Sequence, residues 1–160
     1  MPNPTPAPAP PPPSDDLAPM MNANRGGWNE AMGVRFVRAT MDEVVAEWEV
    51  GPQHRQPYGI VHGGVHAGVI ETLASVGAAI YAMARGQSVV GLENSTSFLR
   101  AVREGKLRAT ARPLQRGRRT QVWEGTITDE SGRTVATGRV RLICLEPDAA
   151  LAGEKVEVRG

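Results

Sequence analysis

The stretch that decides the fold reads Val61-His62-Gly63-Gly64-Val65-His66-Ala67-Gly68-Val69-Ile70-Glu71, and it opens the longest apolar segment of the chain, residues 64–84. This segment has no proline and is rich in alanine, which favours a helix. Its small residues would let neighbouring backbone approach closely. A membrane span is a poor alternative, because Glu71 lies inside the segment and strand-like sequence flanks both of its ends.

Strand-like patterns lie on both sides of this expected helix. Before it, residues 43–50 alternate between two faces with a period of two, and residues 34–40 form a plausible hairpin partner. After it, four more strands are expected, at residues 88–99, 106–114, 120–129 and 134–145. The order of two strands, a long helix and four strands indicates an α+β fold, in which an antiparallel sheet wraps around the helix.

Three of the later strands show one apolar face each. The residues expected to point inward are Leu107, Ala109 and Ala111, then Trp123, Gly125 and Ile127, and finally Ala136, Gly138, Val140, Leu142 and Cys144. The last two strands are joined by Glu130-Ser131-Gly132-Arg133, which is a strong hairpin signal.

Composition divides the chain into three parts. Residues 1–24 form a proline-rich tail with eight prolines between residues 2 and 13, and such sequence favours an extended polyproline II conformation that cannot bury a core. We expect a disordered tail, with a docking peptide for a partner as the alternative. Residues 25–146 form the folded domain, which starts with a short helix near residues 28–32, and residues 147–160 form a polar C-terminal tail.

Charge and cysteine content narrow the function classes. Over 160 residues, Lys and Arg total 18 against 17 Asp and Glu, a net charge of +1. This balance gives no argument for nucleic acid or a membrane surface as partner. Cys144 is the single cysteine, so neither an intrachain disulfide nor a multi-cysteine zinc site can form. A reducing compartment fits, the N-terminus does not resemble a secretory signal, and we expect a cytoplasmic protein.

Glu71 is out of place in its segment, because it is the only acidic or basic residue between Arg55 and Arg85. A carboxylate in an apolar helix under a sheet loses hydration worth several kcal/mol unless it is paired or protonated. One interpretation is a carboxylate at a solvent-facing helix edge or one that caps a backbone donor. The other is a carboxylate that acts as nucleophile or general base.

The glycine pair before the helix is the second functional signal. Gly63 and Gly64 would let another group approach the free N–H donors at a helix N-terminus, where the helix dipole adds positive potential. Such donors suit the oxyanion that develops on a thioester carbonyl. His62 and His66 are four residues apart and could form a metal pair, but a third ligand is missing, and neither belongs to a recognisable Ser-His-Asp arrangement.

Several motifs together resemble the hotdog-fold acyl-CoA thioesterases of the PaaI and 4-hydroxybenzoyl-CoA type. His62-Gly63-Gly64 is followed by Glu71 eight positions after Gly63 and preceded by Gln56 seven positions before it. Residues 93–100 (Glu-Asn-Ser-Thr-Ser-Phe-Leu-Arg), 117–120 and 128–133 also resemble that family. Hotdog domains also serve as dehydratases and acyl-CoA-sensing regulators, so the resemblance is more specific for fold than for reaction.

The resemblance implies a role for each matching residue. Glu71 would attack the thioester or activate water, and the Gly63 N–H would polarise the carbonyl. Gln56 would lie near the same carbonyl or water, Ser75 would support the site, and His62 would hold the loop through hydrogen bonds. No metal or redox cofactor is implied. The alternative function is a catalytically weak module that binds acyl-CoA or lipid, and an isolated carboxylate beside the thioester argues against it.

The remaining expectations concern binding and assembly. The substrate-binding residues are expected to include Gly64, Asn94 and the basic cluster Arg116, Arg118 and Arg119, whose guanidinium groups could bind the CoA phosphates. A solvated hairpin turn is the alternative for this cluster. The resemblance implies a homodimer, with a homotetramer as the alternative. Spacing gives an independent reason, because eight helical residues separate Gly63 and Glu71 by about 12 Å, so one helix cannot easily supply both groups to one thioester.

Overall fold

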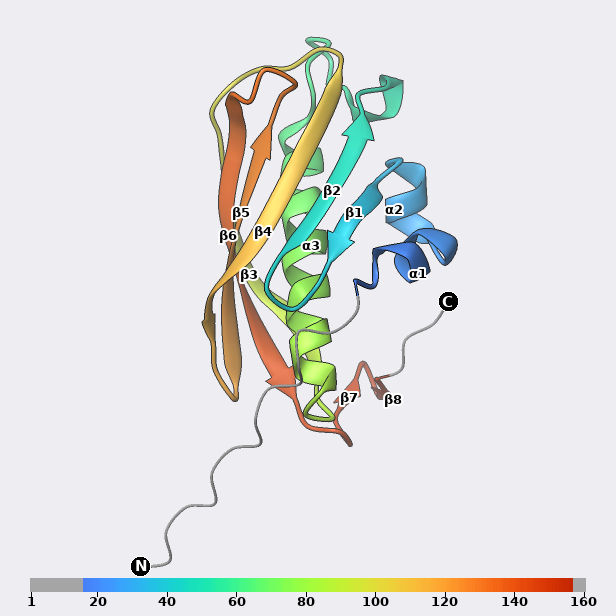
Figure 1. Ribbon diagram of the computed structural model, residues 1–160, viewed down its shortest axis with the longest axis vertical. Coiled ribbons are helices and arrows are strands. Elements are labelled where there is room, and N and C mark those ends of the chain that lie inside the picture. The colour runs from blue at the N-terminus through green and yellow to red at the C-terminus, as the bar shows by residue number, and fades with distance from the viewer. Residues whose placement is uncertain (1–15, 157–160) are drawn as a thin grey trace, which may run out of the picture.

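Helix α3 (Gly63–Met83) lies against a six-stranded antiparallel sheet that wraps around it in the computed structural model, which describes residues 16–156 (Figure 1). Its sheet-facing side is fully buried, with no exposed surface on Val69, Ile70, Leu73, Ala74 or Ala78. By length and hydropathy alone α3 could span a membrane, but here this apolar side forms the core of the domain. The expected α+β fold is confirmed.

The sheet is built from strands in the order β1-β2-β4-β5-β6-β3. Their bounds are β1 Arg35–Ala39, β2 Val44–Glu49, β3 Ser88–Phe98, β4 Lys106–Arg116, β5 Thr120–Thr128 and β6 Thr134–Leu145. The residues expected to point inward on β4, β5 and β6 are buried. Within residues 16–156, strand β3 pairs with β6 alone, so this long strand lies at an edge of the sheet, and this edge is next to α3.

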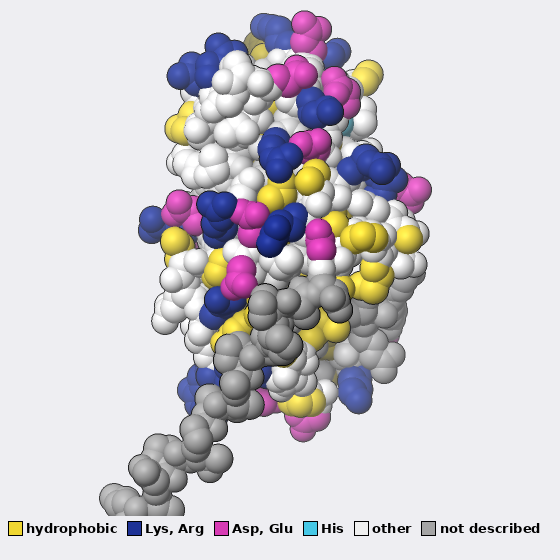
Figure 2. Space-filling view, viewed as in Figure 1, with side chains coloured by type: hydrophobic (Ala, Val, Ile, Leu, Met, Phe, Trp, Pro, Cys, Tyr) yellow, Lys and Arg dark blue, Asp and Glu magenta, His cyan; other side chains and the backbone are white. Residues whose placement is uncertain are grey.

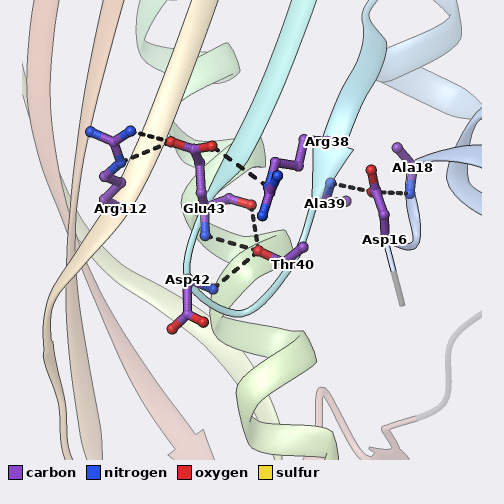
Figure 3. A network of polar contacts seen from close by, with 8 residues as sticks. All are labelled: Asp16, Ala18, Arg38, Ala39, Thr40, Asp42, Glu43 and Arg112. Carbon is purple, nitrogen blue, oxygen red and sulfur yellow. Dashed lines mark hydrogen bonds and ion pairs between the residues drawn. The ribbon is translucent and has the colours of Figure 1, made fainter. Parts of the chain in front are cut away.

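The N-terminal boundary of the domain differs from the prediction. Residues 18–23 form helix α1 (Ala18–Ala23) instead of continuing a disordered tail. The Asp16 carboxylate accepts hydrogen bonds from the backbone N–H of Ala18 at 3.0 Å and of Ala39 at 2.8 Å (Figure 3). Residues 16–24 therefore pack with the rest of the described chain, whereas the sequence placed the start of the domain at residue 25. The rest of the expected proline-rich tail, residues 1–15, lies outside the described residues.

A second short helix, α2 (Gly27–Ala31), matches the helix expected near residues 28–32. It packs Trp28 against α3 at Gly68, where an added Cβ would lie 2.6 Å from the indole ring. The 3-10 helix Pro52–His54 follows β2. His54 is fully buried, and its two ring nitrogens bond to the Gly51 N–H at 2.8 Å and to the Met32 carbonyl at 2.9 Å. His54 thus holds the chain that leads toward α3.

The C-terminal end also differs from the prediction of a plain polar tail. Strands β7 (Ala150–Leu151) and β8 (Glu154–Lys155) form a small exposed hairpin. Charged side chains on the outer surface are mixed in sign, as Figure 2 shows for one face of the molecule. Glu43, for example, is paired with both Arg38 and Arg112 (Figure 3).

Candidate active site

Glu71 lies half-buried on the side of α3 that faces the edge strand β3. Its Oε2 accepts a hydrogen bond from Asn94 Nδ2 at 3.1 Å, and its Oε1 lies 3.5 Å from the Ser75 hydroxyl. The sequence left open a carboxylate at a solvent-facing helix edge and a catalytic one. In the structure the carboxylate lies at the margin of the core and has polar partners on β3 and on the next turn of α3.

Asn94 orients this carboxylate. Its side-chain amide also donates to the Ala67 carbonyl at 3.0 Å, and its Oδ1 accepts a hydrogen bond from Thr96 Oγ1 at 2.6 Å. Both amide hydrogens are therefore used within the chain. Asn94 was expected among the substrate-binding residues, and that contact stays a prediction. What the structure adds is a positioning role, which fixes the rotamer of Glu71.

Gly91 makes room for the same carboxylate. A Cβ on Gly91 would collide with Glu71 Oε1, so any larger residue would push the Glu71 side chain away. The register of β3 with β6 shifts between Gly91 and Glu93, which is the local irregularity expected of a bulge in an edge strand. Asn94 and Gly91 together place the carboxylate on the open side of α3.

The N-terminus of α3 presents one free backbone donor. His62 is the N-cap, and its Nδ1 accepts a hydrogen bond from the Gly64 N–H at 2.8 Å. The Gly64 N–H is thus already used, whereas the Gly63 N–H has no acceptor among residues 16–156. The Phe98 ring would lie 2.7 Å from a Cβ on Gly63, so glycine is required there for the close approach of β3. The contact of Gly64 with substrate stays a prediction.

A pocket of about 340 Å³ opens beside Gly63. It is lined by Gln56, Ile60, Val61, Gly63, His66, Phe98, Leu99, Arg100 and Ala101. Gln56 reaches this pocket from the preceding loop, and its Oε1 accepts a hydrogen bond from the Tyr58 N–H. Glu71 is not among the lining residues, so one chain brings together Gln56, His62 and Gly63 but leaves Glu71 and Ser75 apart from them.

Sequence reasoning missed two residues of this pocket. Phe98 was seen only as part of a motif, although it forms the wall opposite Gly63. His66 was considered with His62 as a possible metal pair, but it is a core residue of which only 2% is exposed. Its Nδ1 is buried without a hydrogen-bond partner in the described part of the chain. Neither feature has a signal in the sequence, because both depend on how the end of β3 crosses the first turns of α3.

Burial lowers the pKa of His66 from the ordinary value of 6.5 to about 4, because the charged imidazolium would lose its hydration. The folded protein therefore keeps His66 neutral at a pH where the unfolded chain already binds a proton there. This difference destabilises the fold as the pH falls through 6.5 and reaches its full size near pH 4.

We predict that acidification from pH 7 to pH 4 removes about 3 kcal/mol of stability through His66, at about 1.4 kcal/mol for each unit between its two pKa values. Denaturant unfolding of wild type and His66→Leu at equal concentration would measure it. The wild type should lose more stability than the variant over this range. Equal losses in the two proteins would contradict the prediction.

The basic cluster divides into one bound and two free side chains. Arg116 Nη1 donates to Asp42 Oδ1 at 2.8 Å and to the Met41 carbonyl at 2.9 Å, and its guanidinium lies 4.9 Å from the centre of the Tyr81 ring. Arg116 therefore has partners within the fold, and its contact with the CoA phosphates stays a prediction. Arg118 and Arg119 are exposed in the β4–β5 turn, and their side chains have no partner among the described residues.

The six-stranded antiparallel sheet wrapped around one long helix is the hotdog fold. The model of the thioesterase superfamily matches residues 58–136, which include the free Gly63 N–H, the pocket beside it and Glu71. The chain also covers most of two relatives that are 42% identical to it, one named as an esterase and one as a thioesterase, and it belongs to the thioesterase superfamily.

The relatives show which thioesterases are similar. Rv1847 of Mycobacterium tuberculosis, which is named as an esterase, is 42% identical over 121 residues, covering 74% of this chain and 86% of the relative. The proofreading thioesterase EntH of Cronobacter turicensis is 42% identical, covering 69% of this chain and 80% of EntH. The chain is thus a thioester hydrolase.

Solved structures agree with this assignment. The structure of Rv1847 matches with a TM-score of 0.73 and 43% identity, covering 74% of this chain and 96% of that one. AziG of S. sahachiroi matches with a TM-score of 0.73 and 41% identity, covering 76% and 98%. Thioesterase HI1161 of Haemophilus influenzae matches with a TM-score of 0.74 and 29% identity, covering 82% and 89%.

Proposed function

We propose that this thioesterase hydrolyses acyl-CoA to a free carboxylic acid and CoA at a site shared by two subunits. The Gly63 N–H of one subunit polarises the thioester carbonyl, and Glu71 of the other attacks it or activates a water molecule. One observation carries the proposal: the free N–H and the half-buried carboxylate lie on one helix, and the pocket beside Gly63 does not include Glu71.

The chemistry needs only these two groups and water. As the carbonyl carbon is attacked, negative charge develops on its oxygen, and a free N–H at a helix N-terminus stabilises that charge. The C–S bond then breaks, and the CoA thiolate takes up a proton. If Glu71 takes the proton from water, hydroxide adds directly; if it attacks, water cleaves the resulting anhydride. Gln56 would contact the carbonyl or the water, and Ser75 would hold Glu71.

The free edge of β3 supports a two-fold partner. β3 runs past α3 so that Gly91 lies at Glu71 and Phe98 lies at Gly63. An unpaired edge strand with exposed apolar side chains, here Leu92 and Phe98, favours pairing with another strand. If two copies of β3 paired antiparallel with residue 91 opposite residue 98, Glu71 of the partner subunit would come to Gly63. Such a pairing is isologous and would give two equivalent sites.

A thiol-release assay tests the reaction. The wild-type protein should release free CoA from at least one member of a panel of short, long and aromatic acyl-CoA thioesters. A dye that reacts with thiols measures the product, and mass spectrometry of the acid confirms hydrolysis. Binding of the thioesters without any release would instead favour an acyl-CoA-binding module.

Arg118 and Arg119 would bind the CoA phosphates across the proposed dimer. In their own subunit they lie near the C-terminal end of α3. This end is about 30 Å from Gly63, because an α-helix rises about 1.5 Å per residue. With Gly63 opposite Glu71 of the partner subunit, the partner's α3 would extend only about 18 Å beyond Gly63. The partner's basic turn would then lie nearer to the thioester, and permanently charged guanidinium groups suit phosphates.

We therefore expect the double substitution Arg118→Ala and Arg119→Ala to raise KM for acyl-CoA several-fold, with a smaller change in kcat. The increase should shrink at high salt, which screens exposed charges. Initial rates at low and high ionic strength would measure it. The control is Arg35→Ala with Arg139→Ala, which removes the same charge from β1 and β6. An equal KM increase in the control would show a general charge effect instead of phosphate binding.

A further inference from the structure

The hydroxyl group of Thr96 completes the contacts of the side chain that holds Glu71. Thr96 lies two residues after Asn94 on β3, so both side chains point to the same face of the strand. The Thr96 Oγ1 donates a hydrogen bond to Asn94 Oδ1 at 2.6 Å. At the other end of the amide, Nδ2 donates to Glu71 Oε2 at 3.1 Å and to the Ala67 carbonyl at 3.0 Å. Thr96 therefore holds the end of the amide that faces away from the carboxylate.

Strand β6 keeps the Thr96 hydroxyl in place. Thr96 lies opposite Gly138 in the pairing of β3 with β6. A Cβ on Gly138 would lie 2.5 Å from Thr96 Oγ1 and 2.9 Å from the Ser95 carbonyl oxygen, so glycine is required there for the close approach of β3. Thr96 is also half-buried, and a β-branched side chain has few χ1 rotamers. The hydroxyl is thus fixed by the sheet, whereas the Asn94 side chain that it contacts is exposed.

We propose that Thr96 is a positioning residue, which holds the reacting carboxylate of Glu71 through the Asn94 amide. This inference rests on the proposed role of Glu71 in thioester hydrolysis. Because Asn94 is exposed, water competes for its amide hydrogens. Without the Thr96 hydroxyl, the amide oxygen loses its donor within the chain, so the amide would turn toward water and release the carboxylate. A displacement of about 1 Å in a catalytic site can cost about a hundredfold in rate.

The substitution Thr96→Val tests this role, because valine has nearly the shape of threonine and lacks the hydroxyl. We expect kcat for acyl-CoA hydrolysis to fall about tenfold, which is near the upper range for the loss of one hydrogen bond. KM should change less than about twofold, because the lost contact is made to Asn94 and not to the substrate. Thr96→Ser keeps the hydroxyl and should retain most of the wild-type kcat.

The matched control is Thr137→Val on the neighbouring strand β6. Thr137 is half-buried like Thr96, and its hydroxyl donates to the Gly125 carbonyl of β5 at 3.1 Å. The control therefore removes one hydroxyl and one hydrogen bond from the same sheet without touching the Asn94 amide. Its kcat should stay within about twofold of wild type. Thermal unfolding of all variants would show whether any loss of turnover follows a loss of stability.

A double-mutant cycle with Asn94→Ala separates positioning from a general structural effect. If Thr96 acts through Asn94, Thr96→Val should lower kcat in the wild-type background and have no further effect in the Asn94→Ala background. A general structural effect would lower kcat by the same factor in both backgrounds.

Three results would overturn the inference. They are a wild-type kcat in Thr96→Val, an equal loss in Thr96→Ser or Thr137→Val, and an equal further loss in the Asn94→Ala background. Near wild-type turnover by Glu71→Gln, or release of no thiol by the wild-type protein, would instead contradict the proposed function itself.

Discussion

Turnover of acyl-CoA by the Glu71→Gln variant is expected to fall at least about a hundredfold, the usual loss when a catalytic base or nucleophile is removed. Glutamine has nearly the same shape as glutamate, and its side-chain oxygen can still accept the hydrogen bond that Asn94 Nδ2 donates to Glu71 at 3.1 Å. The fold and the binding of acyl-CoA should therefore remain largely intact, whereas the negative charge that attacks or activates water is lost.

The control for this variant is Glu93→Gln, which makes the same chemical change on the neighbouring strand. Glu93 is exposed and pairs with Arg141 at 3.0 Å on the outer surface of the sheet, so its loss should leave turnover within about twofold, as for most surface substitutions. Thiol release, thermal unfolding and acyl-CoA binding would be measured on both proteins. Near wild-type turnover by a folded Glu71→Gln protein would disprove the role of Glu71.

The fold could be predicted from the sequence because each of its elements has a strong periodic signal. The apolar face of β6, from Ala136 to Cys144, and the alanine-rich helix around Leu73 are both visible in the one-dimensional pattern. Helix α1 has no such signal, since it is short and follows a proline-rich segment. A tertiary contact holds it, namely the hydrogen bond that the Ala39 N–H of β1 donates to Asp16, and no local pattern reveals this contact.

The candidate site could be read from the sequence only in part. The unusual position of Glu71 in an apolar segment makes it a candidate, but its partner Asn94 depends on the register between β3 and α3. The basic cluster was equally visible, yet only the structure shows that Arg116 is held by Asp42 and Tyr81. The sequence identifies unusual residues. Their ion-pair and hydrogen-bond partners lie on strands that are distant along the chain, so the sequence alone does not reveal them.

The shared site makes a prediction about mixed dimers. A chain with Glu71→Gln and a chain without the Gly63 N–H should each be inactive, while their mixed dimer should regain one intact site and up to about half of the wild-type activity. Gly63→Pro removes the N–H, and proline is well suited to the first position of a helix. The residue before it, His62, has φ −66° and ψ 134°, the extended conformation that a following proline favours.

Proline also adds side-chain atoms where the Phe98 ring would lie 2.7 Å from a Cβ, so Phe98→Leu should accompany it in all chains to make room. Gly63→Ala in the same background is the matched control, since it adds a Cβ but keeps the N–H, and it should retain most of the background activity. If the alanine and proline chains were both inactive, the added side-chain atoms at residue 63 would explain the loss, and the role of the Gly63 N–H would not be supported.

The decisive dimer pairs a chain that carries Glu71→Gln and Gly63→Pro together with a chain that carries neither. In the shared-site arrangement, each of its two sites contains one disabled group, so this dimer should be inactive although one chain is intact at both positions. If instead one subunit supplied both groups, the intact chain would keep its own site and about half of the activity. Differently tagged chains, co-expressed and purified on both tags, would give each mixed dimer for thiol-release assays. The shared-site arrangement would be contradicted if this dimer kept half of the activity and the mixed dimer of the two single variants had none. That result would show that each site lies within one subunit.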